Sequence, residues 1–259
     1  MIGVFDSGLG GLSVLAALVD AIPNADYIYF ADTACVPYGN KSDEFIRQRV
    51  LAIGKELINR GCTLLVVACN TATVSAVSAL RERHPAVPVV GIEPGIKPAA
   101  LATQSGKIAV LVTEATASSE RLARLIHDYA QGIQVFVEPC PGWATQVEQL
   151  HLDSPELRHD AEVRLRPLLE QGVDRIVLGC THYSFLRPLL LPLLAGRAEL
   201  IDVADAVARQ TARLYGDDVE NGRITLLASA NPERLLTALP MLGLPALAAR
   251  VSAATLASV

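Results

Sequence analysis

The chain has 259 residues, of which 51% are hydrophobic and 19% are charged, and its formal net charge is −5. This length fits one large domain or two small ones, and the composition supports a sizeable core rather than intrinsic disorder. The basic residues form no cluster, so we expect no nucleic acid among the partners. The apolar runs are shorter than the roughly 18–20 residues that a membrane-spanning helix needs, so we expect no membrane partner either.

Short apolar runs alternate with helix-like segments from the beginning of the chain to residue 92. Ser42 is followed by Asp43 and Glu44, which is typical of a helix N-cap and its first turn. The regular alternation predicts a parallel sheet with helices on both faces. The expected strands cover residues 2–6, 27–31, 64–68 and 89–92, and the expected helices cover residues 12–21, 43–60 and 73–83.

The same alternation begins again at Lys107, which indicates a diverged duplication, although any doubly wound protein repeats strand and helix segments in a similar way. Residues 93–104 are expected to cross between the halves, and a late strand at residues 224–228 is expected to return to the first. The predicted fold class is α/β, with two doubly wound parallel-sheet domains. Their expected bounds are residues 1–93 plus 206–259 for the first domain and 94–205 for the second. Further strands are expected at 107–112, 134–138 and 175–178, and helices at 119–129, 156–171 and 205–215.

A cysteine follows one apolar strand in each half of the chain. Cys69 comes after 64–68 and Cys180 after 175–178, and polar residues follow both. A single cysteine after a strand is more often part of the core, but two in the same local frame favour chemistry, because ligands gather at the carboxyl ends of parallel strands. Two thiols, one in each half, suit a reaction that removes a proton from one face of a carbon and delivers one to the other.

The five cysteines are odd in number and widely spaced, which argues against a disulfide framework and for a reducing cytoplasm. Histidines have no metal-ligand spacing, so no metal site is expected. The turn 6–11 follows a strand and opens a helix, where backbone N–H groups bind anions, but it is neither a dinucleotide fingerprint nor a P-loop. No cofactor is therefore expected.

Other candidate side chains lie near these strand ends. Asp6 ends an apolar strand and is a candidate to assist Cys69, while His182 is a candidate to assist Cys180. The Pro37-Tyr38-Gly39 turn is expected to present a phenol at the strand ends. Glu148 is either a carboxylate of the second half near the site or a surface residue.

Four motifs together closely resemble the cofactor-independent glutamate racemases. They are Phe5-Asp6-Ser7-Gly8-Leu9-Gly10-Gly11-Leu12-Ser13, Pro37-Tyr38-Gly39, Ala68-Cys69-Asn70-Thr71-Ala72 and Gly179-Cys180-Thr181-His182-Tyr183. The resemblance covers residues 1 to about 215 and implies a pseudo-twofold relation of two α/β domains, with the active site in the cleft between them. It implies a cytoplasmic enzyme that makes D-glutamate for peptidoglycan without a cofactor, and it leaves a homodimer open.

By this resemblance, Cys69 and Cys180 are the two acid/base thiols, assisted by Asp6 and His182. The resemblance also implies a substrate site lined by Asp6, Ser7, Tyr38, Gly39, Asn70, Thr71, Thr181 and His182.

Departures from the family pattern and rival functions stay open at this point. Ser184 stands where the family usually has proline, and Cys35 adds a thiol in the Tyr38 loop. An aspartate or broad-specificity racemase of the same superfamily is the nearest alternative, because one methylene changes binding in a pocket by only about 1–3 kcal/mol. A binding role, such as the gyrase inhibition reported for some glutamate racemases, is at most a second role when both thiols are present.

Overall fold

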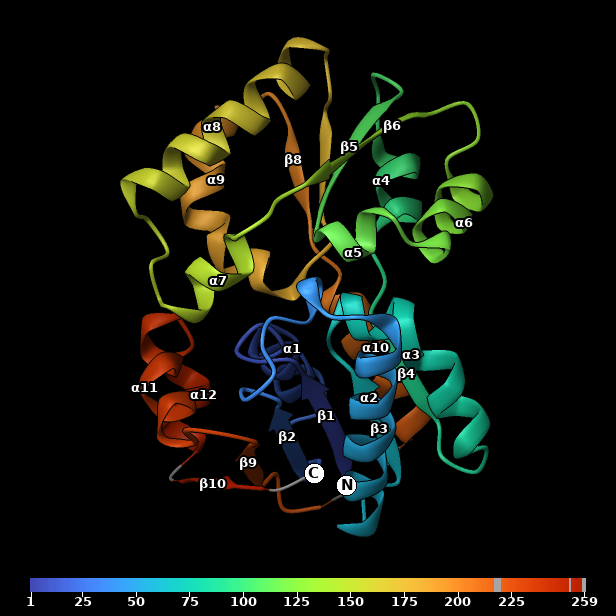
Figure 1. Cartoon of the computed structure of the whole chain (residues 1–259), viewed down its shortest axis with the longest axis vertical. Helices are drawn as coiled ribbons and strands as arrows, with labels where there is room; N and C mark the ends of the chain where they lie inside the picture. Colours follow the sequence, from blue (N-terminus) through green and yellow to red (C-terminus); the bar gives the residue numbers. More distant parts are fainter. Residues whose placement is uncertain (217–219, 252, 258–259) are drawn as a thin grey trace. The chain divides into compact units, whose positions relative to one another are not determined.

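The chain forms two compact units in a computed structural model that describes residues 1–216, 220–251 and 253–257. Unit 1 comprises Met1–Ile92 and Ala204–Val259, and unit 2 comprises Glu93–Val203. Figure 1 labels the helices and strands of both units along the chain.

Unit 1 contains a six-stranded sheet in the order β10-β9-β2-β1-β3-β4, in which every neighbouring pair is parallel. Because all strands run in the same direction, the loops that follow β1, β2 and β3 leave from one edge of the sheet. The strands are β1 (Ile2–Asp6), β2 (Tyr27–Ala31), β3 (Leu64–Val67), β4 (Val89–Gly91), β9 (Ile224–Ala228) and β10 (Ala254–Leu256).

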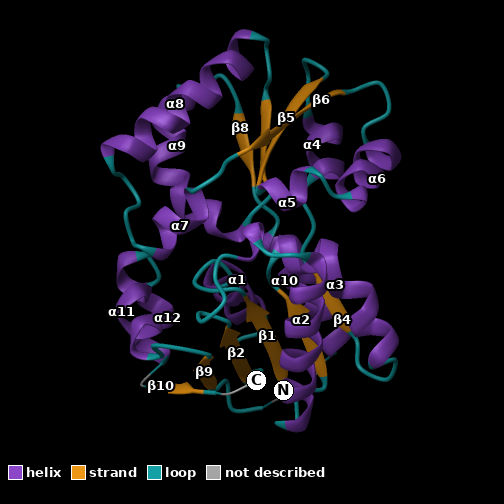
Figure 2. Cartoon of the chain, in the orientation of Figure 1, coloured by secondary structure: helices purple, strands orange, loops and turns teal. Residues whose placement is uncertain are grey.

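Helices cover both faces of this sheet (Figure 2). Helix α2 packs on α3 against one face, and α1 packs on α10. Every second residue of β3 points to the α2/α3 face, so Leu65 and Val67 lie in one core cluster with Ile53 of α2 and Leu80 of α3. The helical elements of the unit are α1 (Leu12–Ala21), η1 (Tyr38–Asn40), α2 (Asp43–Asn59), α3 (Asn70–Arg83), α10 (Ala204–Tyr215), α11 (Glu233–Met241) and α12 (Pro245–Arg250).

Unit 2 contains a four-stranded parallel sheet in the order β6-β5-β7-β8. This is the order β2-β1-β3-β4 of unit 1 repeated, which supports a duplication. The strands are β5 (Lys107–Val112), β6 (Gln134–Pro139), β7 (Arg175–Leu178) and β8 (Glu199–Ile201). The helical elements are α4 (Ile96–Ala102), α5 (Glu114–Ala117), α6 (Glu120–Tyr129), α7 (Trp143–Glu148), α8 (Pro155–Glu170), η2 (Thr181–Leu186) and α9 (Arg187–Leu194).

Two segments differ from the prediction in ways that matter here. Residues 93–104 were expected only to cross between the halves, but they form α4, whose Ile96 and Ala99 join the unit 2 core. Helix α3 begins at Asn70 rather than at Thr73, because Cys69 caps it. Asn70 and Thr71 therefore lie in the first turn of a helix instead of in a loop.

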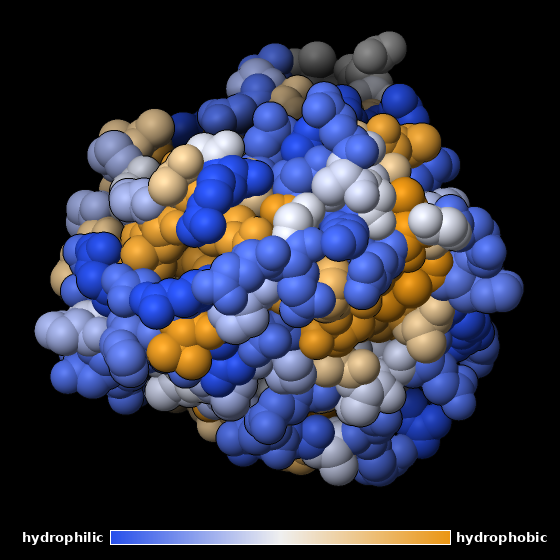
Figure 3. All heavy atoms as spheres, turned by 90° about the horizontal axis from the view of Figure 1, so that it is seen from above, coloured by the Kyte–Doolittle hydropathy of each residue, from blue (hydrophilic) through white to orange (hydrophobic). Residues whose placement is uncertain are grey.

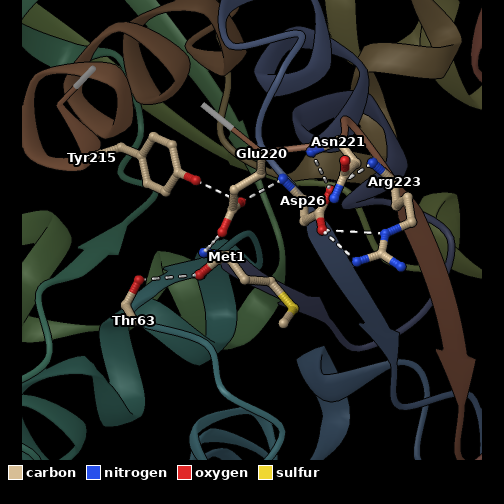
Figure 4. A network of polar contacts seen from close by, with 7 residues as sticks. All are labelled: Met1, Asp26, Thr63, Tyr215, Glu220, Asn221 and Arg223. Carbon is tan, nitrogen blue, oxygen red and sulfur yellow. Dashed lines mark hydrogen bonds and ion pairs between the residues drawn. The ribbon is translucent and has the colours of Figure 1, made fainter. Parts of the chain in front are cut away.

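A polar network fastens the late strand β9 to β2 (Figure 4). The Glu220 carboxylate accepts hydrogen bonds from the Met1 amine, the Asp26 backbone N–H and the Tyr215 hydroxyl at 2.7, 2.7 and 2.5 Å. Asp26 in turn accepts from the backbone N–H of Arg223 at 2.8 Å. These contacts surround the beginning of β2 and hold residues 220–223 in register beside it.

Helix α8 of unit 2 is bordered by two grooves. One, of about 520 Å³, lies between α8 and β6, and the other, of about 310 Å³, lies between α8 and α9. Figure 3 shows a mainly hydrophilic face on which some hydrophobic side chains (orange) reach the surface. Neither groove is lined by Cys69 or Cys180, so neither is the candidate site.

Among the described helices, none has both the length and the apolar character needed to cross a membrane.

Candidate active site

Cys69 lies at the point where β3 ends and α3 begins. Its sulfur accepts a hydrogen bond from the Ala72 backbone N–H at 3.4 Å and lies 3.9 Å from the Ser7 hydroxyl. The side chain is only 5% exposed. The positive end of the α3 dipole stabilises negative charge on the sulfur, so this position favours a thiolate.

Asp6 ends β1, the strand next to β3, and its side chain is buried. One carboxylate oxygen accepts from the Gly8 backbone N–H at 2.8 Å, which fixes the glycine-rich turn. Gly11 lets this turn close over the strand end, because a Cβ at that position would lie 2.6 Å from the Cβ of Asp6 and 3.1 Å from that of Ala68. The turn thus sets the place of Asp6 at the same sheet edge as Cys69.

Asn70 is the candidate whose side chain has no hydrogen-bond partner among the residues that the structure describes. Both polar atoms of its side-chain amide are buried without a hydrogen bond, and the residue is 2% exposed. Leaving a buried polar group unpaired costs about 1–3 kcal/mol, which a bound ligand with matching groups would recover. Thr71, next to it in the first turn of α3, is also buried.

Tyr38 lies in η1, which packs on α3. The sequence pattern predicts a phenol presented at the strand ends, but the Tyr38 hydroxyl donates to the Asp32 carboxylate at 2.6 Å. Arg49 of α2 binds both oxygens of the same carboxylate, at 2.9 and 2.8 Å. Burial and the neighbouring Asp32 raise the pKa of Tyr38, so the phenol stays protonated. The phenol thus anchors the turn that carries Gly39.

Asp32 and Arg49 were not singled out from the sequence. Asp32 is fully buried, and burial alone would raise its pKa, but hydrogen bonds from Arg49 and Tyr38 lower it below its usual value. A signal was present in the sequence, because Asp32 directly follows β2 just as Asp6 ends β1.

Cys180 of unit 2 follows β7 and forms one end of a three-residue chain of polar contacts. Its sulfur lies 3.7 Å from Nδ1 of His182, and Nε2 of His182 lies 2.7 Å from Oε1 of Glu148. All three side chains are buried. The sequence left Glu148 open between a site residue and a surface residue, and the structure places it against His182.

The surroundings of His182 favour its protonated form. Burial by itself would lower the pKa of His182, but hydrogen bonds and charges from Cys180 and Glu148 raise it well above its usual value. In that protonated form, the ring can donate to the sulfur on one side and to the carboxylate on the other. An imidazolium beside a thiol stabilises the thiolate.

Local packing positions Cys180 and the residues after it. Gly179 passes close to β5, because a Cβ there would lie 2.5 Å from Cγ1 of Val112 and 2.9 Å from the Leu111 carbonyl oxygen. The Tyr183 hydroxyl donates to the Cys140 carbonyl at 3.1 Å, which holds η2 against the turn that precedes α7. Thr181, which separates Cys180 from His182 in the sequence, is buried.

The other three cysteines are poor candidates for chemistry. Burial raises the pKa of Cys62 to about 11 and also raises that of Cys140. Burial and the charge of Asp32 raise the pKa of Cys35. These thiols stay protonated near neutral pH, whereas thiolates are the reactive form. Cys35 does pack against the same core cluster as Cys69.

The candidates thus form two groups, one in each unit. In unit 1 the carboxyl ends of β1 and β3 and the η1 turn bring together Asp6, Ser7, Tyr38, Gly39, Cys69, Asn70 and Thr71. In unit 2 the carboxyl end of β7 carries Cys180, Thr181 and His182, and α7 adds Glu148.

Comparison with known proteins agrees with these motifs. Residues 2–211 match the family model described as Asp/Glu/Hydantoin racemase. A glutamate racemase of Pseudomonas aeruginosa is 46% identical over 246 residues, which cover 93% of each chain.

Solved structures agree as well. The Escherichia coli glutamate racemase in complex with L-glutamate and the activator UDP-MurNAc-Ala has a TM-score of 0.85 at 34% identity, over 98% of this chain and 96% of that one. The Francisella tularensis glutamate racemase in complex with D-glutamate has a TM-score of 0.84 at 27% identity, over 100% and 96%. These matches confirm the resemblance read from the four motifs. The chain belongs to the Asp/Glu/Hydantoin racemase family.

Proposed function

We propose that this protein interconverts L- and D-glutamate by a two-thiol acid/base mechanism that uses no cofactor. One observation carries the proposal: Cys69 and Cys180 follow the equivalent strands, β3 and β7, of two sheets with the same strand order. Each thiol also has its own stabilising group, the α3 dipole for Cys69 and His182 for Cys180. Relatives named glutamate racemase support glutamate as the substrate.

In the proposed reaction, one thiolate removes the Cα proton of glutamate, and the C–H electron pair delocalises into the α-carboxylate. The thiol on the opposite face then gives its proton to Cα, which inverts the stereocentre and leaves that sulfur as a thiolate. Cys180 takes the proton from L-glutamate and Cys69 takes it from D-glutamate, as the resemblance implies. The net reaction needs no oxidant or metal, because one proton leaves and one arrives.

The substrate brings two carboxylates and an ammonium group that need hydrogen-bond partners. The amide of Asn70 offers two donors and one acceptor, and in the described part of the chain nothing bonds to it. The hydroxyls of Ser7, Thr71 and Thr181 add neutral donors beside the two thiols.

The proposed physiological role is to supply D-glutamate for peptidoglycan in the cytoplasm. The described cysteines are all free, which suits a reducing compartment. Both thiols must stay reduced for acid/base catalysis, so oxidation in an oxidising compartment would inactivate the enzyme.

Circular dichroism of an L-glutamate solution tests the proposal directly, because racemisation removes the signal. We expect complete loss with the wild type and no loss over the same time with Cys69→Ser or Cys180→Ser. L-aspartate is the control substrate, and faster loss with aspartate would reassign the substrate to the smaller acid. A single thiol variant that racemises near the wild-type rate would overturn the two-thiol mechanism.

A further inference from the structure

The short helix α7 carries Glu148, the carboxylate that holds His182, but α7 has little to stabilise it locally. It has six residues, from Trp143 to Glu148, and its N-cap Gly142 has a φ of 82° and provides no side-chain hydrogen bond. Helices shorter than about 12 residues are marginal on their own in water, so tertiary contacts must hold α7 in place.

Trp143, the first residue of α7, makes two of these tertiary contacts. The indole Nε1–H donates to Oδ2 of Asp160 on α8 at 2.7 Å. The other side of the ring packs on Tyr183 of η2 in an edge-to-face contact, with ring centroids 5.3 Å apart and an interplanar angle of 67°. Trp143 is 1% exposed and is the only tryptophan in the chain. It therefore joins α7 both to α8 and to the element that carries His182.

Arg164 holds Asp160 in position for this contact. Its Nε donates to Oδ2 of Asp160 at 2.7 Å, the same oxygen that accepts from Trp143. Its Nη1 donates to Oε1 of Glu138 and to the Pro139 carbonyl, both at 2.7 Å. Glu138 and Pro139 end β6, directly before the turn that leads into α7. Arg164 thus joins α8 to the end of β6, directly before the turn into α7.

We propose that Trp143, Asp160 and Arg164 form a clamp in which they act as positioning residues, setting α7 so that Glu148 meets His182 beside Cys180. The clamp rests on the proposed two-thiol function. Trp143 and Glu148 lie at opposite ends of α7, about 7.5 Å apart along the axis at 1.5 Å per residue. A tilt at Trp143 therefore moves the Glu148 carboxylate, which lies at hydrogen-bond distance from the ring.

The clamp acts only on Cys180. Its loss should therefore affect the isotope effects of the two enantiomers unequally, which general damage to the fold would not do. A misplaced Glu148 loosens His182 and slows proton transfer at Cys180, so proton removal from L-glutamate becomes more rate-limiting. The primary deuterium isotope effect with [2-²H]-L-glutamate should rise, while that with [2-²H]-D-glutamate should change less. A displacement of about 1 Å in an active site can cost roughly 100-fold in rate, so we expect kcat/KM to fall about 10- to 100-fold in both directions.

The experiment compares Trp143→Phe, Asp160→Asn and Asp153→Asn in the full-length protein. Trp143→Phe keeps the aromatic contact and loses the N–H donor, and Asp160→Asn removes the charge that binds Arg164. Asp153→Asn is the matched control, because Asp153 pairs with Arg158 near the beginning of α8 in an exposed contact that involves neither α7 nor Trp143. The first two variants should show the fall in kcat/KM and the L-specific isotope effect, and the control should behave as wild type.

Tryptophan fluorescence adds a readout that does not depend on activity. Because Trp143 is the only tryptophan, its emission maximum reports the indole environment directly. We expect a shifted maximum in Asp160→Asn and none in Asp153→Asn. Thermal melts identify any variant that fails to fold, and Asp160→Glu, which keeps the carboxylate, should recover part of the rate. Wild-type kcat/KM and isotope effects in both Trp143→Phe and Asp160→Asn would overturn the clamp, whereas absence of racemisation in the wild type would overturn the proposed function instead.

Discussion

His182 and Glu148 form a buried pair beside Cys180, with Nε2 of the ring 2.7 Å from Oε1 of the carboxylate. The carboxylate favours the charged form of the buried histidine, since it compensates for lost hydration. It also gives Cys180 a different environment from Cys69, whose sulfur caps a helix. The two thiols are equivalent in topology but are stabilised by different means.

This difference predicts an asymmetry between the two directions of the reaction. The enantiomers have equal free energy, so kcat/KM must be the same in both directions for any variant. His182→Asn should lower both by about 10²- to 10⁴-fold and should raise the substrate deuterium isotope effect for L-glutamate more than for D-glutamate.

Asp6→Asn provides the matched comparison, because Asp6 belongs to the unit of Cys69. Asp6→Asn should raise the substrate deuterium isotope effect for D-glutamate more than that for L-glutamate. If both variants give equal isotope effects in the two directions, Asp6 and His182 position the substrate and do not serve separate thiols.

The raised pKa of His182 predicts a direct titration result. Of the five histidine signals in an NMR titration, the one that disappears in His182→Asn should titrate well above pH 6.5. Glu148→Gln should lower that pKa, because it removes the negative charge beside the ring. An unchanged pKa in Glu148→Gln would mean that the carboxylate does not hold the charge.

The raised pKa of His182 also makes the free energy of unfolding depend on pH. A folded-state pKa above the unfolded value means that the charged ring stabilises the protein fully below about pH 6.5 and that this contribution is lost as pH rises through the folded pKa. Urea unfolding between pH 6 and pH 9 should therefore show a falling free energy of unfolding, and His182→Asn should flatten this slope.

Asp32 predicts the opposite dependence in unit 1. Its folded pKa is lowered, so its contribution to stability is present above about pH 4 and is lost as pH falls through the folded value. Asp32→Asn should cost about 3–5 kcal/mol of the free energy of unfolding, because it leaves the guanidinium of Arg49 without its buried partner. Asp153→Asn, at an exposed pair, should cost less than about 1 kcal/mol. Equal losses in the two variants would contradict this reading of the Asp32 pair.

Gly179 predicts a steric effect on Cys180. Gly179→Ala places a methyl group 2.5 Å from Cγ1 of Val112 and 2.9 Å from a backbone oxygen, so the end of β7 must shift. We expect a loss of about 1–3 kcal/mol in stability and of about 100-fold in kcat/KM. The double variant Gly179→Ala/Val112→Ala should recover part of the rate, because it relieves the side-chain contact but not the backbone one. Wild-type activity in Gly179→Ala would show that β7 adapts without moving the thiol.

The sequence by itself determined the alternation of elements and the two thiol positions. Short apolar runs and a cap such as Ser42 are local signals, because periodicity and hydrogen bonding within a few residues produce them. Cys69 and Cys180 could be found since each directly follows a strand. The C-terminal segment was predicted less fully: α11, α12 and β10 were missed, and α12 and β10, with six and three residues, are too short to show a period.

Only the tertiary structure decided which polar groups meet. Glu148 and His182 are 34 residues apart in the chain, and Arg49 and Asp32 are 17 apart, and no local pattern pairs them. Tyr38 illustrates the same limit, because its motif indicates a turn but not that the phenol bonds to Asp32. Burial makes these pairings obligatory, since a buried polar group without a partner is costly, but which partner it finds depends on how helices pack against each sheet.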